Sequence, residues 1–158
     1  MHQLIGLIGL LFAAAAPAGT PQGLEWTPAD TAAVGATCGD MPMAQLAALP
    51  VAQRTARLAC YTRESARRLS TRLPHQVDDV TVLERISVDG TELTYHNKVS
   101  VLRADVPAAA IQTFTTNVRT TVCNSEGMRN TIQVGGSYRY IWVDRNGEPL
   151  AQLLVTSC

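Results

Sequence analysis

The sequence lacks the short motifs that identify most catalytic sites. It has no G-x-S-x-G nucleophile elbow, no Walker A motif, no G-x-G-x-x-G and no H-E-x-x-H. It also has no charge bias, because 13 Lys and Arg balance 13 Asp and Glu to a formal net charge of zero. The field of the whole molecule therefore attracts neither nucleic acid nor an anionic surface. We expect a protein that is not an enzyme and has no nucleic-acid partner.

Cysteines are few, and their spacing does not suit a metal. Cys38, Cys60, Cys123 and Cys158 are separated by 22, 63 and 35 residues, without a C-x-x-C or a paired His. We therefore expect no metal and no cofactor. An even number of cysteines in an oxidising compartment predicts two disulfides, although four cysteines allow three pairings. We favour Cys38–Cys60, which is local, and Cys123–Cys158, which joins the predicted ends of a helix and of the last strand.

The only long apolar run lies at the N-terminus. Residues 4–16 are too short to span a bilayer as a helix, and the run closes on Ala16-Pro17-Ala18, whose small residues suit signal peptidase. We predict a signal peptide over residues 1–18, cleaved after Ala18, and hence a periplasmic or secreted protein. Since no Lys or Arg precedes the run, a wrongly assigned start codon or an apolar arm is the alternative. No Cys lies near the cleavage site, which argues against a lipid anchor.

The remaining chain predicts an arm followed by one domain. Residues 19–37 are rich in Pro, Gly, Ala and Thr and predict a loosely ordered, flexible arm. Residues 38–158 predict a single disulfide-stabilised α+β domain. Its helical segments are a short helix over 41–50, a long one over 51–72 that Pro74 ends, and a third over 108–123.

Two segments of the domain have the period-two pattern of β-hairpins. Apolar residues alternate on both sides of Asp89-Gly90, which predicts a tight turn that pairs Ile86 with Leu93 and leaves Leu83 off the buried face. A second hairpin is predicted over 137–158. The resulting order is α-α-β-β-α-β-β, and the predicted fold is a four-stranded antiparallel sheet of two hairpins with helices packed on one face.

One surface stands out in this neutral sequence. The long helix carries six Arg against a single Glu, a net charge of +5. An acidic groove of another envelope protein or an anionic membrane surface suits such a helix, and a solvated arginine face is the alternative. The candidate binding residues combine this helix with the aromatic residues of the last hairpin: Arg63, Arg67, Arg68, Arg72, Tyr138, Tyr140 and Trp142.

The link after the long helix gathers a His and two carboxylates. His75, Asp78 and Asp79 suggest an acid–base pair, and therefore a cell-envelope hydrolase as the alternative function. Polar residues that solvate a turn explain the same stretch. A small-ligand carrier, with its ligand between sheet and helices, is a further alternative.

The second half of the chain, residues 73–158, resembles a widespread group of small exported bacterial proteins without an assigned activity. The matching positions are Leu73-Pro74, Val77-Asp78, Tyr95, Cys123, Arg129, Tyr138, Tyr140, Asp144, Gly147 and Cys158. The layout is similar, more distantly, to the pilotins of type II secretion systems. That resemblance implies helices around an antiparallel sheet and a groove that binds a short helix of an outer-membrane secretin. It implies a binding protein: an assembly factor, a pilotin-like chaperone or an inhibitor.

Overall fold

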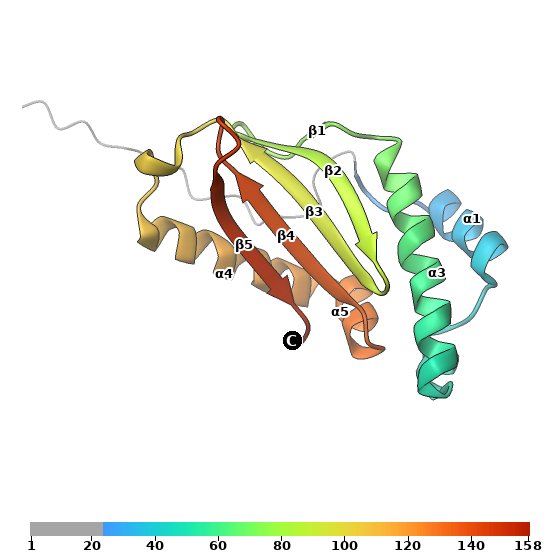
Figure 1. Cartoon of the computed structure of the whole chain (residues 1–158). Coiled ribbons are helices and arrows are strands. Elements are labelled where there is room, and N and C mark those ends of the chain that lie inside the picture. The colour runs from blue at the N-terminus through green and yellow to red at the C-terminus, as the bar shows by residue number, and fades with distance from the viewer. Residues whose placement is uncertain (1–23) are drawn as a thin grey trace, which may run out of the picture.

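A computed structural model describes residues 24–158 of the chain (Figure 1). The elements are α1 (Pro28–Cys38), α2 (Met43–Ala48), α3 (Val51–Ser70), β1 (His75–Gln76), β2 (Thr81–Asp89), β3 (Glu92–Val99), the 3₁₀ turn η1 (Arg103–Asp105), α4 (Ala108–Asn124), α5 (Glu126–Gln133), β4 (Ser137–Val143) and β5 (Pro149–Val155). The predicted signal peptide and its cleavage site lie outside the described residues. Within them, every helix is too short or too polar to cross a membrane.

The prediction of a flexible arm over residues 19–37 is wrong for most of the described residues in that range, because residues 28–38 form α1. Thr27 caps the helix: its hydroxyl accepts from the backbone N–H of Asp30, and the Asp30 carboxylate accepts from the backbone N–H of Thr27. Pro28 occupies the first turn, where its missing N–H costs nothing. Capping residues mark the start of this helix, and its apolar residues follow no clear helical period. A search for periodicity in the sequence therefore does not predict it.

The sheet has five strands in the order β1-β2-β3-β4-β5. Both predicted hairpins are present, because β2 pairs antiparallel with β3 and β4 pairs antiparallel with β5. The prediction of a wholly antiparallel, four-stranded sheet is wrong on two counts. The two-residue β1 adds a fifth strand, and β3 and β4 are parallel. The crossover that α4 and α5 provide allows this parallel pairing, which a short turn cannot make.

The register of the first hairpin differs from the predicted one by two residues. Ile86 lies opposite Tyr95 rather than Leu93. A shift of two residues keeps each side chain on its face, so the predicted buried face survives at this end. Farther along β2, a bulge between Leu83 and Arg85 reverses the alternation and turns Leu83 into the core, where it is 1% exposed. Val80, just before β2, is 45% exposed.

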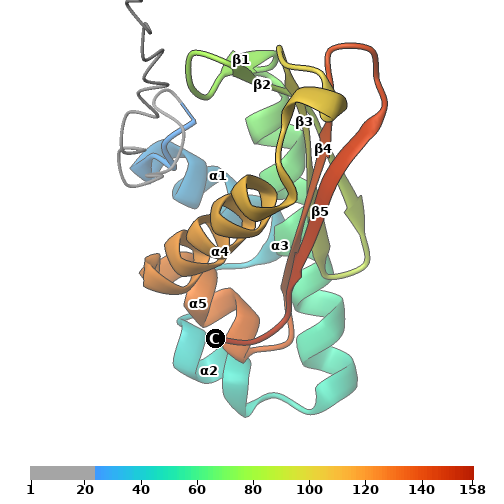
Figure 2. The ribbon, with the colours of Figure 1, turned by 90° about the vertical axis from the view of Figure 1, so that its left-hand side faces the viewer.

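The main core lies between one face of the sheet and the helices. Figure 2 shows α1, α4 and α5 on the same side of the strands. The buried residues that form this core come from the segment before α1, from α3, α4 and α5, and from four strands: Leu24, Ala66, Leu69, Leu83, Ile86, Leu93, Val122, Ile132, Tyr138 and Val155. A smaller cluster of Leu46, Leu58 and Val134 joins α2 and α3 to the end of α5. Helices therefore pack on one face, as predicted.

Two disulfides join elements that are distant in the chain. Cys38, at the end of α1, is bonded to Cys60 in α3, with the Cα atoms 5.8 Å apart. Cys123, near the end of α4, is bonded to Cys158, the last residue, with the Cα atoms 5.5 Å apart. These are the two pairings that the sequence favours. They suit an oxidising compartment.

Candidate binding groove

The aromatic residues predicted to bind a partner lie on the inner face of the sheet. Tyr138 is 6% exposed and Trp142 is 3% exposed. Tyr140 stacks between Tyr95 and Trp142, with ring centroids 4.9 Å and 5.6 Å away. Burial raises the pKa of both Tyr95 and Tyr140 above the usual tyrosine value. This aromatic stack belongs to the core, and only Tyr95 and Tyr138 also reach a hollow at its edge.

Two of the four predicted arginines face inward. The carboxylate of Asp30 in α1 is fully buried and binds the guanidinium groups of Arg68, at 2.9 Å, and Arg72, at 2.6 Å. Hydrogen bonds from Arg72 and from the Thr27 backbone hold the pKa of Asp30 well below its usual range. Arg68 and Arg72 therefore fasten α1 to α3 and are not available to a partner in this arrangement.

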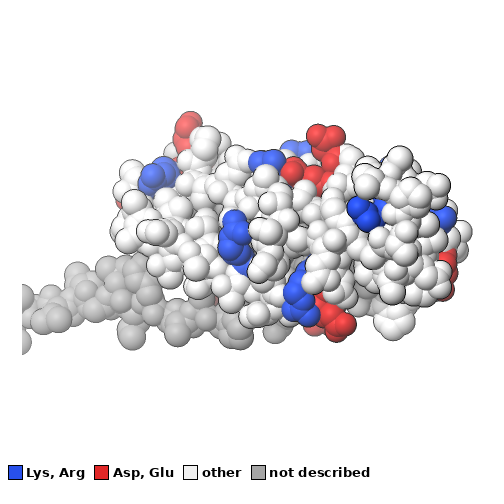
Figure 3. All heavy atoms as spheres, turned by 90° about the horizontal axis from the view of Figure 1, so that it is seen from below, with Lys and Arg blue, Asp and Glu red and all other residues white. Residues whose placement is uncertain are grey.

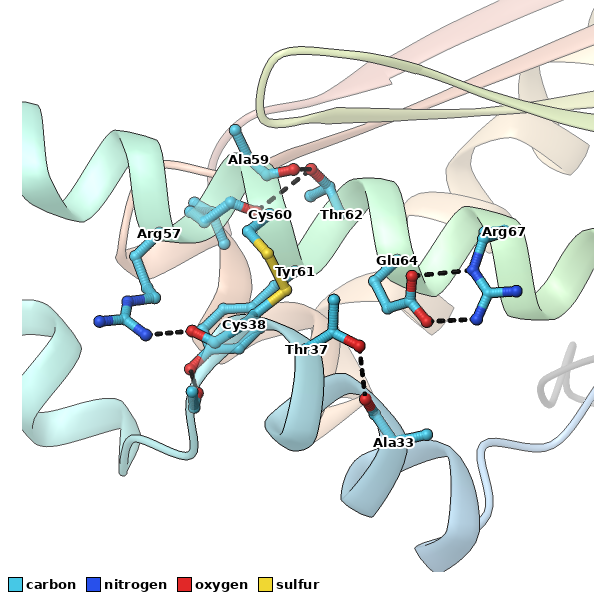
Figure 4. Close-up of a disulfide and its surroundings, with 12 residues drawn as sticks. Ala33, Thr37, Cys38, Arg57, Ala59, Cys60, Tyr61, Thr62, Glu64 and Arg67 are labelled. Carbon is cyan, nitrogen blue, oxygen red and sulfur yellow. Dashed lines mark hydrogen bonds and ion pairs between the residues drawn. A yellow bond between two sulfur atoms is a disulfide. The ribbon is translucent and has the colours of Figure 1, made fainter.

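The other arginines of α3 are dispersed. Arg67 makes a two-pronged ion pair with Glu64 at 2.8 Å and 2.5 Å, and it lowers the pKa of that carboxyl. Arg57 donates to the carbonyl of Cys38 (Figure 4). Arg63 is exposed. Seen from below, the Lys and Arg side chains are separated by uncharged residues, and acidic ones lie among them (Figure 3). The structure does not gather the four predicted arginines and the three aromatic residues on one surface.

The His and the two carboxylates predicted for a hydrolase do not form an acid–base pair. The Asp78 carboxylate accepts from the backbone N–H groups of Val80, at 2.9 Å, and Thr81, at 2.8 Å, and so shapes the loop before β2. No hydrogen bond between described residues joins His75 to Asp78 or Asp79, and Nε2 of His75 is buried without a partner. Among residues 24–158, no three His, Cys, Asp or Glu side chains lie close enough to hold a metal ion.

Several positions of the C-terminal pattern have structural roles. The buried Asp144 accepts from the backbone N–H groups of Arg103, Asn146 and Glu148 and so organises the turn before β5. These hydrogen bonds, first among them that from the Arg103 backbone, lower the pKa of Asp144. The guanidinium of Arg129 donates to the carbonyl of Cys123 at 2.9 Å and satisfies the end of α4. These positions of the pattern therefore maintain the fold rather than form a site.

A groove of about 570 Å³ lies between the helices and the inner face of the sheet. Its walls come from the segment before α1, from α1, α2 and α3 with the link between α1 and α2, from β3 and β4, and from the start of α5. The apolar residues that line it are Leu24, Trp26, Val34, Met41, Met43, Leu46, Leu58, Tyr61, Leu69, Leu93, Tyr95, Met128 and Tyr138.

The side chains at the groove are adaptable and partly exposed. All three methionines of the described residues line it. Methionine is flexible and polarisable, and it is common at surfaces that accept varied apolar partners. Trp26 and Met43 are 42% and 38% exposed although both are large and apolar. The pilotin resemblance implies a groove, but the sequence does not show which residues line it, because they come from segments that are distant in the chain and share no period.

One wall of the groove is held in place by three contacts at the end of α1. The Cys38–Cys60 disulfide fixes this end to α3, Tyr61 donates to the carbonyl of Gly39 at 2.6 Å, and Arg57 donates to that of Cys38 (Figure 4). Gly39 has φ = 83°, and a Cβ there would collide with the Arg57 guanidinium. This corner therefore requires glycine.

Comparison with known proteins identifies solved structures that share this fold. No family model matches the sequence, and the search of curated proteins found no match. Three solved structures share the fold. A pilotin of the type 2 secretion system of Vibrio vulnificus, EpsS, has a TM-score of 0.60 at 18% identity and covers 67% of this chain and 94% of its own. The type II secretion pilotin AspS of Vibrio cholerae has a TM-score of 0.55 at 23% identity and covers 66% and 94%.

The third structure is a protein of Pseudomonas aeruginosa named as secreted. It has a TM-score of 0.57 at 18% identity and covers 64% of this chain and 90% of its own. Identities this low establish a common fold and leave the activity open. About two thirds of the chain therefore has the fold of two type II secretion pilotins and of this third protein.

Proposed function

We propose that this chain is a non-enzymatic protein of the cell envelope that binds an apolar helical segment of another envelope protein in the groove. The observation that carries the proposal is the groove itself, with its three methionines and its exposed Trp26 and Met43. Helix-in-groove recognition places the side chains i, i+3, i+4 and i+7 of an amphipathic helix into such a hollow.

The groove favours a protein segment over a small ligand. By volume it falls within the range of ligand pockets, about 300–1,000 Å³. Large apolar side chains that remain exposed beside the hollow, however, extend the apolar surface beyond it and suit a partner larger than a small ligand. Trp26 and Met43 are such side chains, and both contribute to the lining.

The fold and the disulfides support an envelope partner. Two of the structures with this fold are pilotins of secretion systems, so an assembly factor of pilotin type is the form of the proposal that we favour over an inhibitor. The two disulfides suit the oxidising periplasm, in which such partners are assembled. The basic helix is a poorer candidate, because its arginines mostly bind groups of this chain.

Site-specific photo-cross-linking in the native envelope tests this function. A photoreactive residue in place of Met43 should cross-link one envelope protein through an amphipathic segment, identified by mass spectrometry of the linked peptides. The same residue in place of Thr116, exposed on α4 and outside the groove lining, is the matched control.

A second change tests whether the groove is the contact. Met128→Glu places a charge in the apolar lining and should abolish the cross-link from position 43, because burying an unpaired carboxylate is costly. Thr116→Glu should leave it unchanged. Equal cross-linking from positions 43 and 116, or none from either, would contradict the proposal.

A further inference from the structure

We propose that the segment bound in the groove carries a Lys or Arg beside its apolar face, and that this residue forms an ion pair with Asp40. The inference rests on the proposed function and deepens it, since it specifies the charge of the partner segment.

Among residues 24–158, Asp40 is the only charged side chain that lines the groove. The other lining residues are apolar or carry uncharged polar groups such as those of Thr31, Thr62, Ser65 and Ser125. Thr62 is already engaged, because its hydroxyl donates to the carbonyl of Gly90 at 2.9 Å. A single carboxylate in an apolar lining gives the groove one strong preference, and that preference is for a cation.

The carboxylate of Asp40 has no partner of its own among the described residues. No hydrogen bond or ion pair joins it to another residue of 24–158, and the residue is exposed. Five other acidic groups have partners: Asp30, Glu64 and Glu92 are paired with arginines, while Asp78 and Asp144 accept backbone N–H groups. Among the described carboxylates without such a partner, Asp40 is distinguished by its place in the groove lining.

Asp40 lies just beyond the end of α1. Its side chain lies against Gly35 of α1, where a Cβ would come within 3.6 Å of the Asp40 Cβ. The last turn of α1 holds no basic residue of its own that could pair with Asp40. Arg57, at the same corner, donates to the carbonyl of Cys38 and forms no ion pair with Asp40.

The expected effect is modest. An ion pair at an exposed site contributes up to about 1 kcal/mol, which corresponds to roughly a two- to five-fold difference in affinity. The apolar face supplies most of the binding energy, and the ion pair selects among apolar segments. The selectivity should weaken as salt is added, because both charges are accessible to solvent.

Peptide titration tests the charge preference directly. Two designed amphipathic helical peptides share one apolar face, and one carries Lys while the other carries Glu at the positions that flank it. Trp142→Phe leaves Trp26, in the groove lining, as the only tryptophan, so its fluorescence reports binding. On this background the Lys peptide should bind about two- to five-fold more tightly than the Glu peptide.

Variants at position 40 decide whether Asp40 is responsible. Asp40→Asn should make the two affinities equal, and Asp40→Lys should reverse their order. Asp79→Lys, which changes an exposed aspartate outside the groove, should keep the preference for Lys. A preference that survives Asp40→Asn overturns the role of Asp40 while the groove itself still binds. If neither peptide binds, the proposed function fails together with this inference.

Discussion

Asp30 engages two of the arginines that make α3 basic. Its buried carboxylate caps α1 through Thr27 and accepts from Arg68 and Arg72 of α3. A buried carboxylate needs such partners, because an unpaired charge is very costly to remove from water. The charge of α3 is therefore used to hold the N-terminal helix in place.

Replacement of Asp30 should lower the stability markedly. Asp30→Ala removes both the helix cap and the acceptor of two guanidinium groups, so we expect the free energy of unfolding at neutral pH to fall by roughly 2–4 kcal/mol. Urea denaturation measures this free energy of unfolding. Asp79→Ala, at an exposed aspartate, should change the same quantity by less than about 0.5 kcal/mol. Equal effects of the two changes would contradict the role assigned to Asp30.

Asp30 should also contribute to the loss of stability at acid pH. The folded-state pKa of Asp30 is lowered from its ordinary value of 3.8, so its contribution is complete above that pH and is lost as the pH falls below it. Wild type should therefore lose stability more steeply between about pH 4 and pH 2 than Asp30→Asn does. Parallel pH curves for the two proteins would show that Asp30 is not the titrating group.

The sequence shows the unusual positive charge of α3, but it does not show that two of the arginines bind Asp30 of α1. The ion pairs join Asp30 to residues 38 and 42 positions farther along the chain, and no local pattern links them. The aromatic residues were misassigned for a related reason. Alternation in a strand shows that Tyr138, Tyr140 and Trp142 share a face, but it does not show whether helices cover that face. Burial depends on contacts between distant segments.

Among the elements, the end of α1 is both a structural joint and a wall of the groove. The Cys38–Cys60 disulfide fixes it to α3, whereas Cys123–Cys158 fixes the C-terminus to α4 and makes no link to α1. The two bridges close loops of similar length, so their effects on stability should be similar. Their effects on binding should differ.

Removal of each disulfide separates these two effects. Cys38→Ser with Cys60→Ser, or Cys123→Ser with Cys158→Ser, should lower the free energy of unfolding by roughly 3–4 kcal/mol in each case. Only the first pair of changes should weaken peptide binding in the groove, because it releases the wall formed by α1. Denaturation and fluorescence titration, under conditions in which both variants remain folded, measure the two quantities. Equal loss of affinity in both variants would contradict this division of roles.

The sequence predicted most of the elements but not how they join. Both hairpins and the helices α2, α3 and α4 follow from local periodicity and from the positions of proline and glycine. The parallel contact of β3 with β4 does not, because only the path of α4 and α5 determines which strands become neighbours. The groove depends on that same arrangement, so it could not be located before the strand order was known.

At the scale of the molecule, the parallel contact joins the two halves of the chain into one structure. Leu93 of β3 lies opposite Tyr138 of β4, which in turn lies opposite Val155 of β5. All three are buried in the core that also contains Leu69 of α3 and Val122 of α4. Neither hairpin has a core of its own: α3 packs on β2 and β3 and α4 packs on β5, but the buried side chains of both hairpins belong to one cluster.

A shared core predicts a single unfolding transition. Differential scanning calorimetry of the protein with both disulfides intact should give one peak, with an enthalpy of roughly 90–100 kcal/mol near 60 °C for a domain of this size and equal calorimetric and van't Hoff enthalpies. Leu93→Ala, which removes packing at the junction of the halves, should lower the midpoint of that peak without splitting it. Two separate peaks, or a calorimetric enthalpy well above the van't Hoff value, would show that the hairpins unfold as independent units. In that case the groove between the helices and the sheet would not be held by a common core.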